Sequence, residues 1–289
     1  MTNPSDIHDP EGQRRVAIAQ RVADAHRGID DASLLALVSG STVEGLADAR
    51  SDVDMSVVFA AVPEEALLRQ ACRRAGGGEW TWHQGDAQEG LVVAFQVDGM
   101  EVQIGYCSHA WLDHELDDLL VRHNPDTPNH KLAEGMLKAV PLAGAERLAE
   151  LQQRLSAFPP ELGRAMVVHG LVGPVSWRGV AQLIHRDAGL WCRDIQADAC
   201  YRLLLVLAGL NGCYFTRFQV KRMHRLGAAL AIAPPALAGR IDALLQAPPH
   251  EAFAALHRLE GEVLDLVAAH RSDVDLSVAR KRHAAFAPD

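Results

Sequence analysis

Residues 38–59 read VSGSTVEGLADARSDVDMSVVF, and this stretch decides the fold that we predict for the chain around it. The apolar run that ends at Val38 meets a Gly40-Ser41 step, as a buried strand does where it passes into a turn. Ser41 and Glu44 have the spacing of a capping box. We therefore expect a short helix to begin there, with free backbone N–H groups that attract phosphate.

A second strand is predicted from Asp52 to Phe59, because its apolar and polar residues alternate. Val53, Met55 and Val57 face one way, and the opposite face carries Asp52, Asp54 and Ser56. Two neighbouring carboxylates repel each other unless a cation lies between them, and hard oxygen ligands beside a phosphate-binding turn suit Mg²⁺. A bare Asp-x-Asp is more often a pair of solvated side chains on a surface strand, so the pair gains its meaning from the turn before it.

A third carboxylate is offered by residues 100–106, which read MEVQIGY. Val102, Ile104 and Tyr106 form the apolar side of a strand and leave Glu101 on the other face. Facing residues of adjacent strands lie about 5 Å apart, close enough for Glu101 to join the two aspartates around a cation. Taken alone, Glu101 is an ordinary exposed strand glutamate, and Asp98 is the alternative third acid.

The order of these features resembles the signature of the DNA polymerase β-like nucleotidyltransferase superfamily, a Gly-Ser turn followed by Asp-x-Asp on the next strand. The strand of Glu101 resembles the one that carries the third acid in antibiotic adenylyltransferases, the aminoglycoside enzymes among them. The resemblance implies an α+β fold, with an N-terminal nucleotidyltransferase domain of mixed sheet flanked by helices and an all-α C-terminal domain. It also implies catalytic and metal-binding roles for Asp52, Asp54 and Glu101, and nucleotide contacts from Gly40, Ser41 and Ser51. Glu101 is either a metal ligand or the general base.

The composition is that of a globular protein with room for two cores: 289 residues, 48% hydrophobic and 22% charged. A net charge of −9 argues against non-specific nucleic-acid binding and favours small or cationic acceptors. The five cysteines have no CxxC spacing, and the chain shows neither a signal peptide nor an apolar run of membrane length. We expect reduced thiols, no zinc site and no membrane contact in a cytoplasmic protein.

A break at Pro125 to Asn129 predicts the domain boundary, with the nucleotidyltransferase domain in residues 1–124 and the helical domain in residues 130–289. From Ser108 onward the pattern is helical, and proline or glycine separates the segments. We expect helices over residues 131–140, 143–157 and 161–171 and no further strand.

The second half contains one basic segment. Leu203 to Leu210 is apolar nearly all round, which predicts a buried central helix closed by Asn211. Arg217, Lys221 and Arg225 recur every four positions, as cations on one face of a helix do. A solvated helix face explains them as well as a triphosphate site does. In antibiotic adenylyltransferases, however, the helical domain lends basic and amide side chains to the nucleotide phosphates, and this resemblance implies that role for Lys221 first, then for Asn211 and Arg217.

Residues 272–278 read SDVDLSV and nearly repeat residues 51–57, SDVDMSV. The second copy lacks a Gly-Ser turn before it and a strand after it that would carry a third acid. We therefore expect Ser272 and Asp273 to cap a last helix, as serine and aspartate often do, and not to form a second site.

The resemblance implies transfer of a nucleoside monophosphate, AMP from ATP, to a hydroxyl of a small aminoglycoside-like acceptor. Mg²⁺ takes part, and pyrophosphate leaves. Two alternatives stay open: a nucleotidyltransferase acting on a protein or RNA, as in toxin–antitoxin pairs, and a non-catalytic nucleotide-binding protein. The sequence does not name the acceptor, the preferred base or the oligomeric state.

Overall fold

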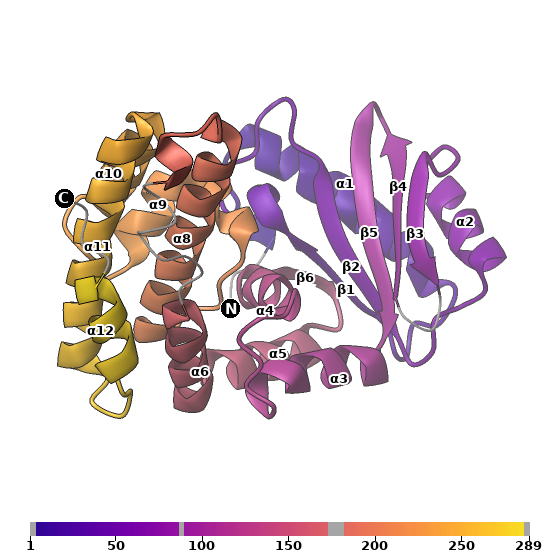
Figure 1. Cartoon of the computed structure of the whole chain (residues 1–289). Coiled ribbons are helices and arrows are strands. Elements are labelled where there is room, and N and C mark those ends of the chain that lie inside the picture. The colour runs from indigo at the N-terminus through magenta and orange to yellow at the C-terminus, as the bar shows by residue number, and fades with distance from the viewer. Residues whose placement is uncertain (1–3, 87–89, 173–181, 286–289) are drawn as a thin grey trace. The chain divides into compact units, whose positions relative to one another are not determined.

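The computed structural model describes residues 4–86, 90–172 and 182–285. The chain forms two compact units: unit 1 is residues 1–117 with 132–157, and unit 2 is residues 118–131 with 158–289. Figure 1 shows the elements of both units. In chain order the first are η1 (Pro4–Asp6), α1 (Pro10–Arg27), β1 (Leu35–Ser39), η2 (Gly40–Thr42), β2 (Val53–Phe59), α2 (Glu65–Arg74), β3 (Trp82–Asp86), β4 (Gly90–Val97), β5 (Met100–Ser108), α3 (His109–Leu120), α4 (Asn129–Lys138), β6 (Val140–Ala143) and α5 (Ala145–Ser156). They are followed by α6 (Pro160–Leu171), α8 (Gly189–Leu210), η3 (Arg217–Arg222), α9 (Met223–Ala229), α10 (Leu237–Gln246), α11 (Pro249–His270) and α12 (Ser277–Ala285).

Unit 1 is built on one sheet with the strand order β3-β4-β5-β2-β1-β6 (Figure 1). β2 and β5 are parallel, and every other pair of neighbours in this sheet is antiparallel. Between β2 and β5 the chain passes through α2, β3 and β4, so the parallel pair is joined by a crossover connection. The mixed sheet, the helices beside it and the helical second half confirm the predicted α+β class.

The alternation in β2 and β5 sorts their side chains onto two faces, as predicted. Val53, Met55 and Val57 of β2 are buried, and Asp52 and Asp54 are half-buried. The apolar residues share one core cluster with residues of α1 and α2, such as Val22 and Leu68. The carboxylate face of the sheet is therefore the face opposite to these two helices.

Residues 132–157 depart from the prediction, which assigned them to helices alone and to the second domain. Val140–Ala143 forms β6, which pairs with β1 and so binds this segment to the sheet of unit 1. The strand is only four residues long and contains Pro141. An edge strand accommodates a proline because one of its sides needs no N–H donor, but such a short segment shows no alternation by which the sequence would reveal it.

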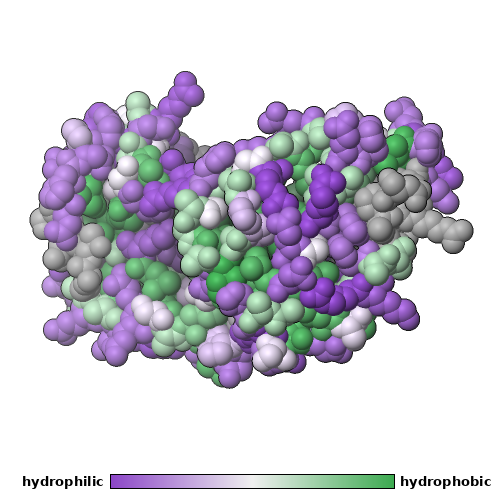
Figure 2. Space-filling model, turned by 90° about the vertical axis from the view of Figure 1, so that its left-hand side faces the viewer, coloured by the Kyte–Doolittle hydropathy of each residue, from purple (hydrophilic) through white to green (hydrophobic). Residues whose placement is uncertain are grey.

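In unit 2, the predicted central helix is α8, whose Leu203, Leu204 and Leu207 are buried. α6 and α11 pack against it. A Cβ on Gly209 would lie 2.7 Å from the carbonyl oxygen of Gly163, so α6 and α8 meet backbone to backbone. Seen from the side of α10, α11 and α12, the surface is largely hydrophilic with smaller hydrophobic areas between (Figure 2). No helix among the described residues combines the length and the apolar character needed to cross a membrane.

The repeated segment 272–278 forms no strand in unit 2. The predicted cap is displaced by a few residues: Asp273 pairs with Arg271 at 2.8 Å, and α12 begins only at Ser277. Asp275 accepts hydrogen bonds from the backbone N–H of Ser277 at 2.8 Å and from its hydroxyl at 3.0 Å. Asp275, and not Ser272 or Asp273, is therefore the residue whose side chain bonds to the start of this helix.

Unit 2 also contains a buried histidine. His130 is 1% exposed, its Nδ1 accepts a hydrogen bond from the Phe215 N–H at 3.4 Å, and its ring lies 6.0 Å from that of Tyr214. Burial lowers the pKa of His130 to about 4. The folded chain therefore holds His130 neutral at pH values at which an unfolded chain protonates it, since an exposed histidine has a pKa of about 6.5.

This pKa predicts the pH dependence of stability. Above pH 6.5 His130 is neutral in both the folded and the unfolded state. As the pH falls toward 4, the unfolded state binds a proton on His130 and the folded state does not. The free energy of unfolding therefore drops by about 3 kcal/mol. Urea titrations at pH 7 and pH 4 measure the drop. His130→Gln should lose less stability over this range than the wild type, whereas His250→Gln, at a side chain that is 68% exposed, should not differ from it. Equal drops in all three proteins would contradict the prediction.

Candidate active site on the sheet

The turn after β1 is tighter than predicted. Gly40–Thr42 forms η2, a single 3-10 turn, and Ser39 precedes it without a side-chain cap. The predicted capping box of Ser41 and Glu44 is therefore wrong, and no α-helix begins there. Gly40 has φ +67°, which reverses the chain within one residue at the end of the strand. Because η2 is one turn long, we assign no phosphate site to a helix start at this position.

The same glycine lies against Asp54. In the antiparallel pair of β1 and β2, Ser39 is the partner of Asp54. A Cβ on Gly40 would lie 2.2 Å from Asp54 Oδ2, so the carboxylate occupies the space that any other side chain at position 40 would need. The structure thus brings the glycine of the turn and the second aspartate of the Asp-x-Asp pair together.

Glu101 lies on the same side of the sheet as the two aspartates. The parallel register pairs Val53 with Val102 and Asp54 with Gln103. By this register Asp52, just before β2, is level with Glu101. Parallel neighbours lie about 4.8 Å apart, so the backbone brings the three predicted acids to one end of one face.

The three carboxylates do not form a closed cluster. Across the described residues, no three His, Cys, Asp or Glu side chains lie close enough together to hold a metal ion. Glu101 Oε1 instead accepts a hydrogen bond from Gln103 Nε2 at 2.8 Å, while Asp54 lies against Gly40. The donor set still fits Mg²⁺, because this ion takes oxygen ligands and is commonly bound by one or two carboxylates plus water and phosphate oxygens.

Asp98, the alternative third acid, pairs with Arg21 at 2.6 Å and is 59% exposed. It lies in the hairpin turn between β4 and β5 with φ 50°. The ion pair with Arg21 of α1 gives Asp98 a structural partner, and Glu101 remains the candidate third acid of the site.

The residues before Asp52 form a turn that closes on Asp48. The carboxylate of Asp48 accepts hydrogen bonds from the Arg50 N–H at 2.9 Å and from the Ser51 hydroxyl at 3.1 Å, and these bonds lower its pKa. The Ser51 N–H donates to the Asp48 carbonyl at 3.0 Å. Ser51, predicted as a nucleotide contact, therefore has its N–H and hydroxyl within this turn.

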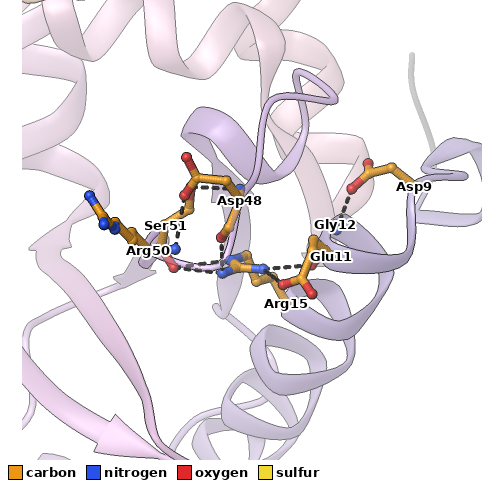
Figure 3. Close-up of polar contacts among 7 residues, drawn as sticks. All are labelled: Asp9, Glu11, Gly12, Arg15, Asp48, Arg50 and Ser51. Atoms are coloured by element: carbon orange, nitrogen blue, oxygen red, sulfur yellow. Dashed lines mark hydrogen bonds and ion pairs between the residues drawn. The ribbon is translucent and has the colours of Figure 1, made fainter.

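Sequence reasoning missed the arginine that holds this turn. Arg15 of α1 is 1% exposed and donates to the backbone carbonyls of Asp48 and Ser51 (Figure 3). A signal was present: Arg15 precedes Ile18 and Val22 at helical spacing, so a charged residue stands on the apolar stripe of the helix. A charge placed there needs partners that a helical pattern alone does not reveal.

The predicted nucleotide contact Asn211 is a structural residue of unit 2. Its amide nitrogen donates to the carbonyls of Leu207 at 2.7 Å and Ile232 at 2.9 Å, and its side-chain oxygen accepts from the Ile232 N–H at 2.9 Å. These bonds close the end of α8 and join it to the segment before α10. We therefore withdraw the phosphate contact assigned to Asn211.

The predicted basic stripe does not form either. Arg217 and Lys221 lie in η3, which has three residues per turn, so side chains four positions apart do not share one line. Arg217 pairs with Asp198 at 2.9 Å and lies 4.4 Å from the ring of Tyr201. Lys221 is exposed, with its ammonium 5.7 Å from the ring of Phe218. Lys221 stays a candidate phosphate contact, whereas the guanidinium of Arg217 is paired with the Asp198 carboxylate.

Comparisons with known proteins identify no family. No family model matches the chain, and no curated protein does. Among solved structures, the chain is similar to a nucleotidyltransferase-like protein from Exiguobacterium sibiricum 255-15. The match has 14% sequence identity and a TM-score of 0.46, and covers 91% of this chain and 80% of that one. A match of this identity and TM-score does not assign a function to this chain.

The contact between Gly40 and Asp54 predicts a difference between two glycines. Gly40 and Gly45 have nearly the same φ, +67° and +65°, but a Cβ on Gly45 meets nothing within 4 Å. Gly45→Ala should cost only the backbone strain, about 1 kcal/mol, whereas Gly40→Ala should cost more, because the Asp54 side chain has to move away from the new Cβ. Urea titration of both variants measures the difference, and equal losses would show that Asp54 is not held in this space.

Proposed function

We propose that this protein is a nucleotidyltransferase that moves AMP from ATP to a hydroxyl of a small-molecule acceptor and releases pyrophosphate. One observation carries the proposal: the parallel register of β2 and β5 puts Asp52, Asp54 and Glu101 at one end of one sheet face, beside the Gly40 turn. Three carboxylates on a rigid sheet beside a close backbone turn suit phosphoryl chemistry, which depends on positioning and on neutralising charge.

Asp52 and Asp54 would hold the Mg²⁺ of this reaction. The bound ion would supply charge neutralisation for the phosphate oxygens and bring them to the sheet. The chain contributes the rest: one carboxylate just before β2 and one within it, on the same face, and a glycine that leaves room for Asp54. A site of two carboxylates needs no third protein ligand, which agrees with the absence of a three-residue cluster in the described part of the chain.

Glu101 is then the proposed general base. The acceptor hydroxyl oxygen forms a bond to the α-phosphorus as the bond to the bridging oxygen breaks, pyrophosphate leaves with that bonding pair, and the hydroxyl proton passes to Glu101. Gln103 donates to Glu101 Oε1 at 2.8 Å and holds the carboxylate along the strand. The other oxygen is left for the acceptor proton.

The acidic charge of the chain favours a cationic acceptor. The net charge of −9 attracts aminoglycoside-like polyamines and disfavours non-specific binding of nucleic acid. In unit 2, exposed Lys221 is the proposed contact for a nucleotide phosphate. The donor ATP and the Mg²⁺ ion thus complete the set of ligands that we propose.

A second candidate, transfer to RNA, is favoured by one local feature. Phe218 is 56% exposed, and the ammonium groups of Lys131 and Lys221 lie 4.4 and 5.7 Å from its ring. An exposed ring beside cations is a common platform for single-stranded nucleic acid. Incubation with labelled ATP and either aminoglycosides or total RNA separates the two candidates by which one takes up label. ATP binding without label on either would favour a non-catalytic nucleotide-binding protein.

Asp54→Asn should abolish transfer, because an amide replaces one of the two carboxylates that hold the ion. Pyrophosphate release from ATP with the acceptor measures this, and circular dichroism checks that the variant is folded. Asp31→Asn, which neutralises a carboxylate that is 65% exposed, is the matched control and should keep wild-type turnover. Near-normal turnover by folded Asp54→Asn would remove the metal assignment.

Glu101→Gln should lower kcat by about a hundredfold or more, since an amide takes up no proton from the acceptor hydroxyl. Its affinity for Mn²⁺, used as a probe for Mg²⁺, should stay within twofold of the wild type. A tenfold loss of Mn²⁺ affinity would instead make Glu101 a metal ligand.

A further inference from the structure

Arg15 uses all of its guanidinium nitrogens on partners within unit 1. Nε donates to the Ser51 carbonyl at 3.1 Å, and one terminal nitrogen donates to the carbonyls of Ser51 at 2.9 Å and Asp48 at 2.5 Å. The other terminal nitrogen donates to the carbonyl of Glu11 at 3.0 Å and to its carboxylate at 2.6 Å. In Figure 3 the guanidinium lies between α1 and the turn of residues 48–51.

The hydrogen bonds of Arg15 hold the backbone of Ser51, the residue directly before the first aspartate of the site. Ser51 is directly followed by Asp52, and β2 begins one residue later at Val53. Asp52 therefore lies between two fixed points: the Ser51 carbonyl, held by Arg15, and the ladder of β2 and β5. Figure 3 shows the Arg50 side chain extending away from the Arg15 guanidinium, so Arg15 hydrogen-bonds to the backbone of this turn and not to the Arg50 side chain.

From this geometry we propose that Arg15 is a positioning residue for Asp52. It touches no ligand; it sets where the Asp52 carboxylate stands relative to Asp54 by fixing the carbonyls of the preceding turn to α1. This inference rests on the proposed function, because it assigns Arg15 to the metal affinity of that same site. Partners of this kind behind metal ligands commonly change affinity by 10-fold to 100-fold.

The chemistry of the contact requires arginine. A planar fork with five N–H donors serves three carbonyls and a carboxylate at once, while lysine has one nitrogen with which to do so. Methionine has about the length of the stem but leaves the carbonyls of Asp48 and Ser51 without this donor. The ion pair between Arg15 and Glu11 can be removed separately. Glu11 is 43% exposed and belongs to α1, so the loss of its charge leaves the hydrogen bonds from Arg15 to the turn in place.

The test compares Arg15→Met and Arg15→Lys with Glu11→Gln and the wild type. Mn²⁺ affinity is measured by the electron paramagnetic resonance of free Mn²⁺, and amide hydrogen exchange reports on residues 48–53 and, separately, on β4 and β5. We expect Arg15→Met to bind Mn²⁺ at least about tenfold more weakly, with faster exchange confined to residues 48–53. Glu11→Gln should stay within twofold of the wild type. Arg15→Lys, which keeps the charge, should lie between the two.

The outcomes are distinct. If the wild type binds no Mn²⁺, or if Asp54→Asn binds it equally well, the proposed function fails at its metal site. If the wild type binds through Asp54 and either folded Arg15 variant binds as tightly as the wild type, the positioning role is overturned. Faster exchange across β4 and β5 in Arg15→Lys would also overturn it, because the arginine would then support the whole sheet. Should Arg15→Met fail to fold, Arg15→Lys decides the matter alone.

Discussion

The parallel pairing of β2 with β5 is the constraint on which the candidate site depends. Both strands carry their acids close to their first residues, and only parallel neighbours bring first residues to the same end of a sheet. If β5 ran the other way beside β2, Glu101 would lie near Phe59, the length of the strand from Asp52, about 20 Å. The crossover through α2, β3 and β4 is the length of chain that parallel pairing requires.

Burial on one face of the sheet holds the acids on the other. Val53, Met55 and Val57 are locked into the core with α1 and α2, and a slip of one residue in β2 would exchange them with the aspartates. The register is therefore determined by hydrophobic burial, and the position of the carboxylates follows from it. Gly40 and Arg15 add local support, the first by leaving space for Asp54 and the second by anchoring the chain before Asp52.

The sequence predicted the two strands of the site well because their alternation is a local property. It failed where contacts between distant residues decide. β6 is defined by pairing with β1 and not by its own four residues. The sequence predicts a phosphate contact for Asn211, but the Asn211 amide hydrogen-bonds to the backbone of Ile232 at the end of α8. The basic residues of η3 were read at α-helical spacing, and a 3-10 helix turns them onto different lines.

The two copies of the SDVD motif separate the two kinds of information. By itself, the sequence determined that each copy offers alternating apolar and acidic residues, that the class is α+β, and that Asp52, Asp54 and Glu101 belong together if their strands pair. Tertiary structure alone decided that residues 53–59 pair with β1 on one side and with β5 on the other, and that Asp275, not Ser272 or Asp273, bonds to the start of the last helix at Ser277. The physical reason is that a strand satisfies its backbone N–H and carbonyl groups with other strands, and only the folded chain brings those partners to the first copy and not to the second.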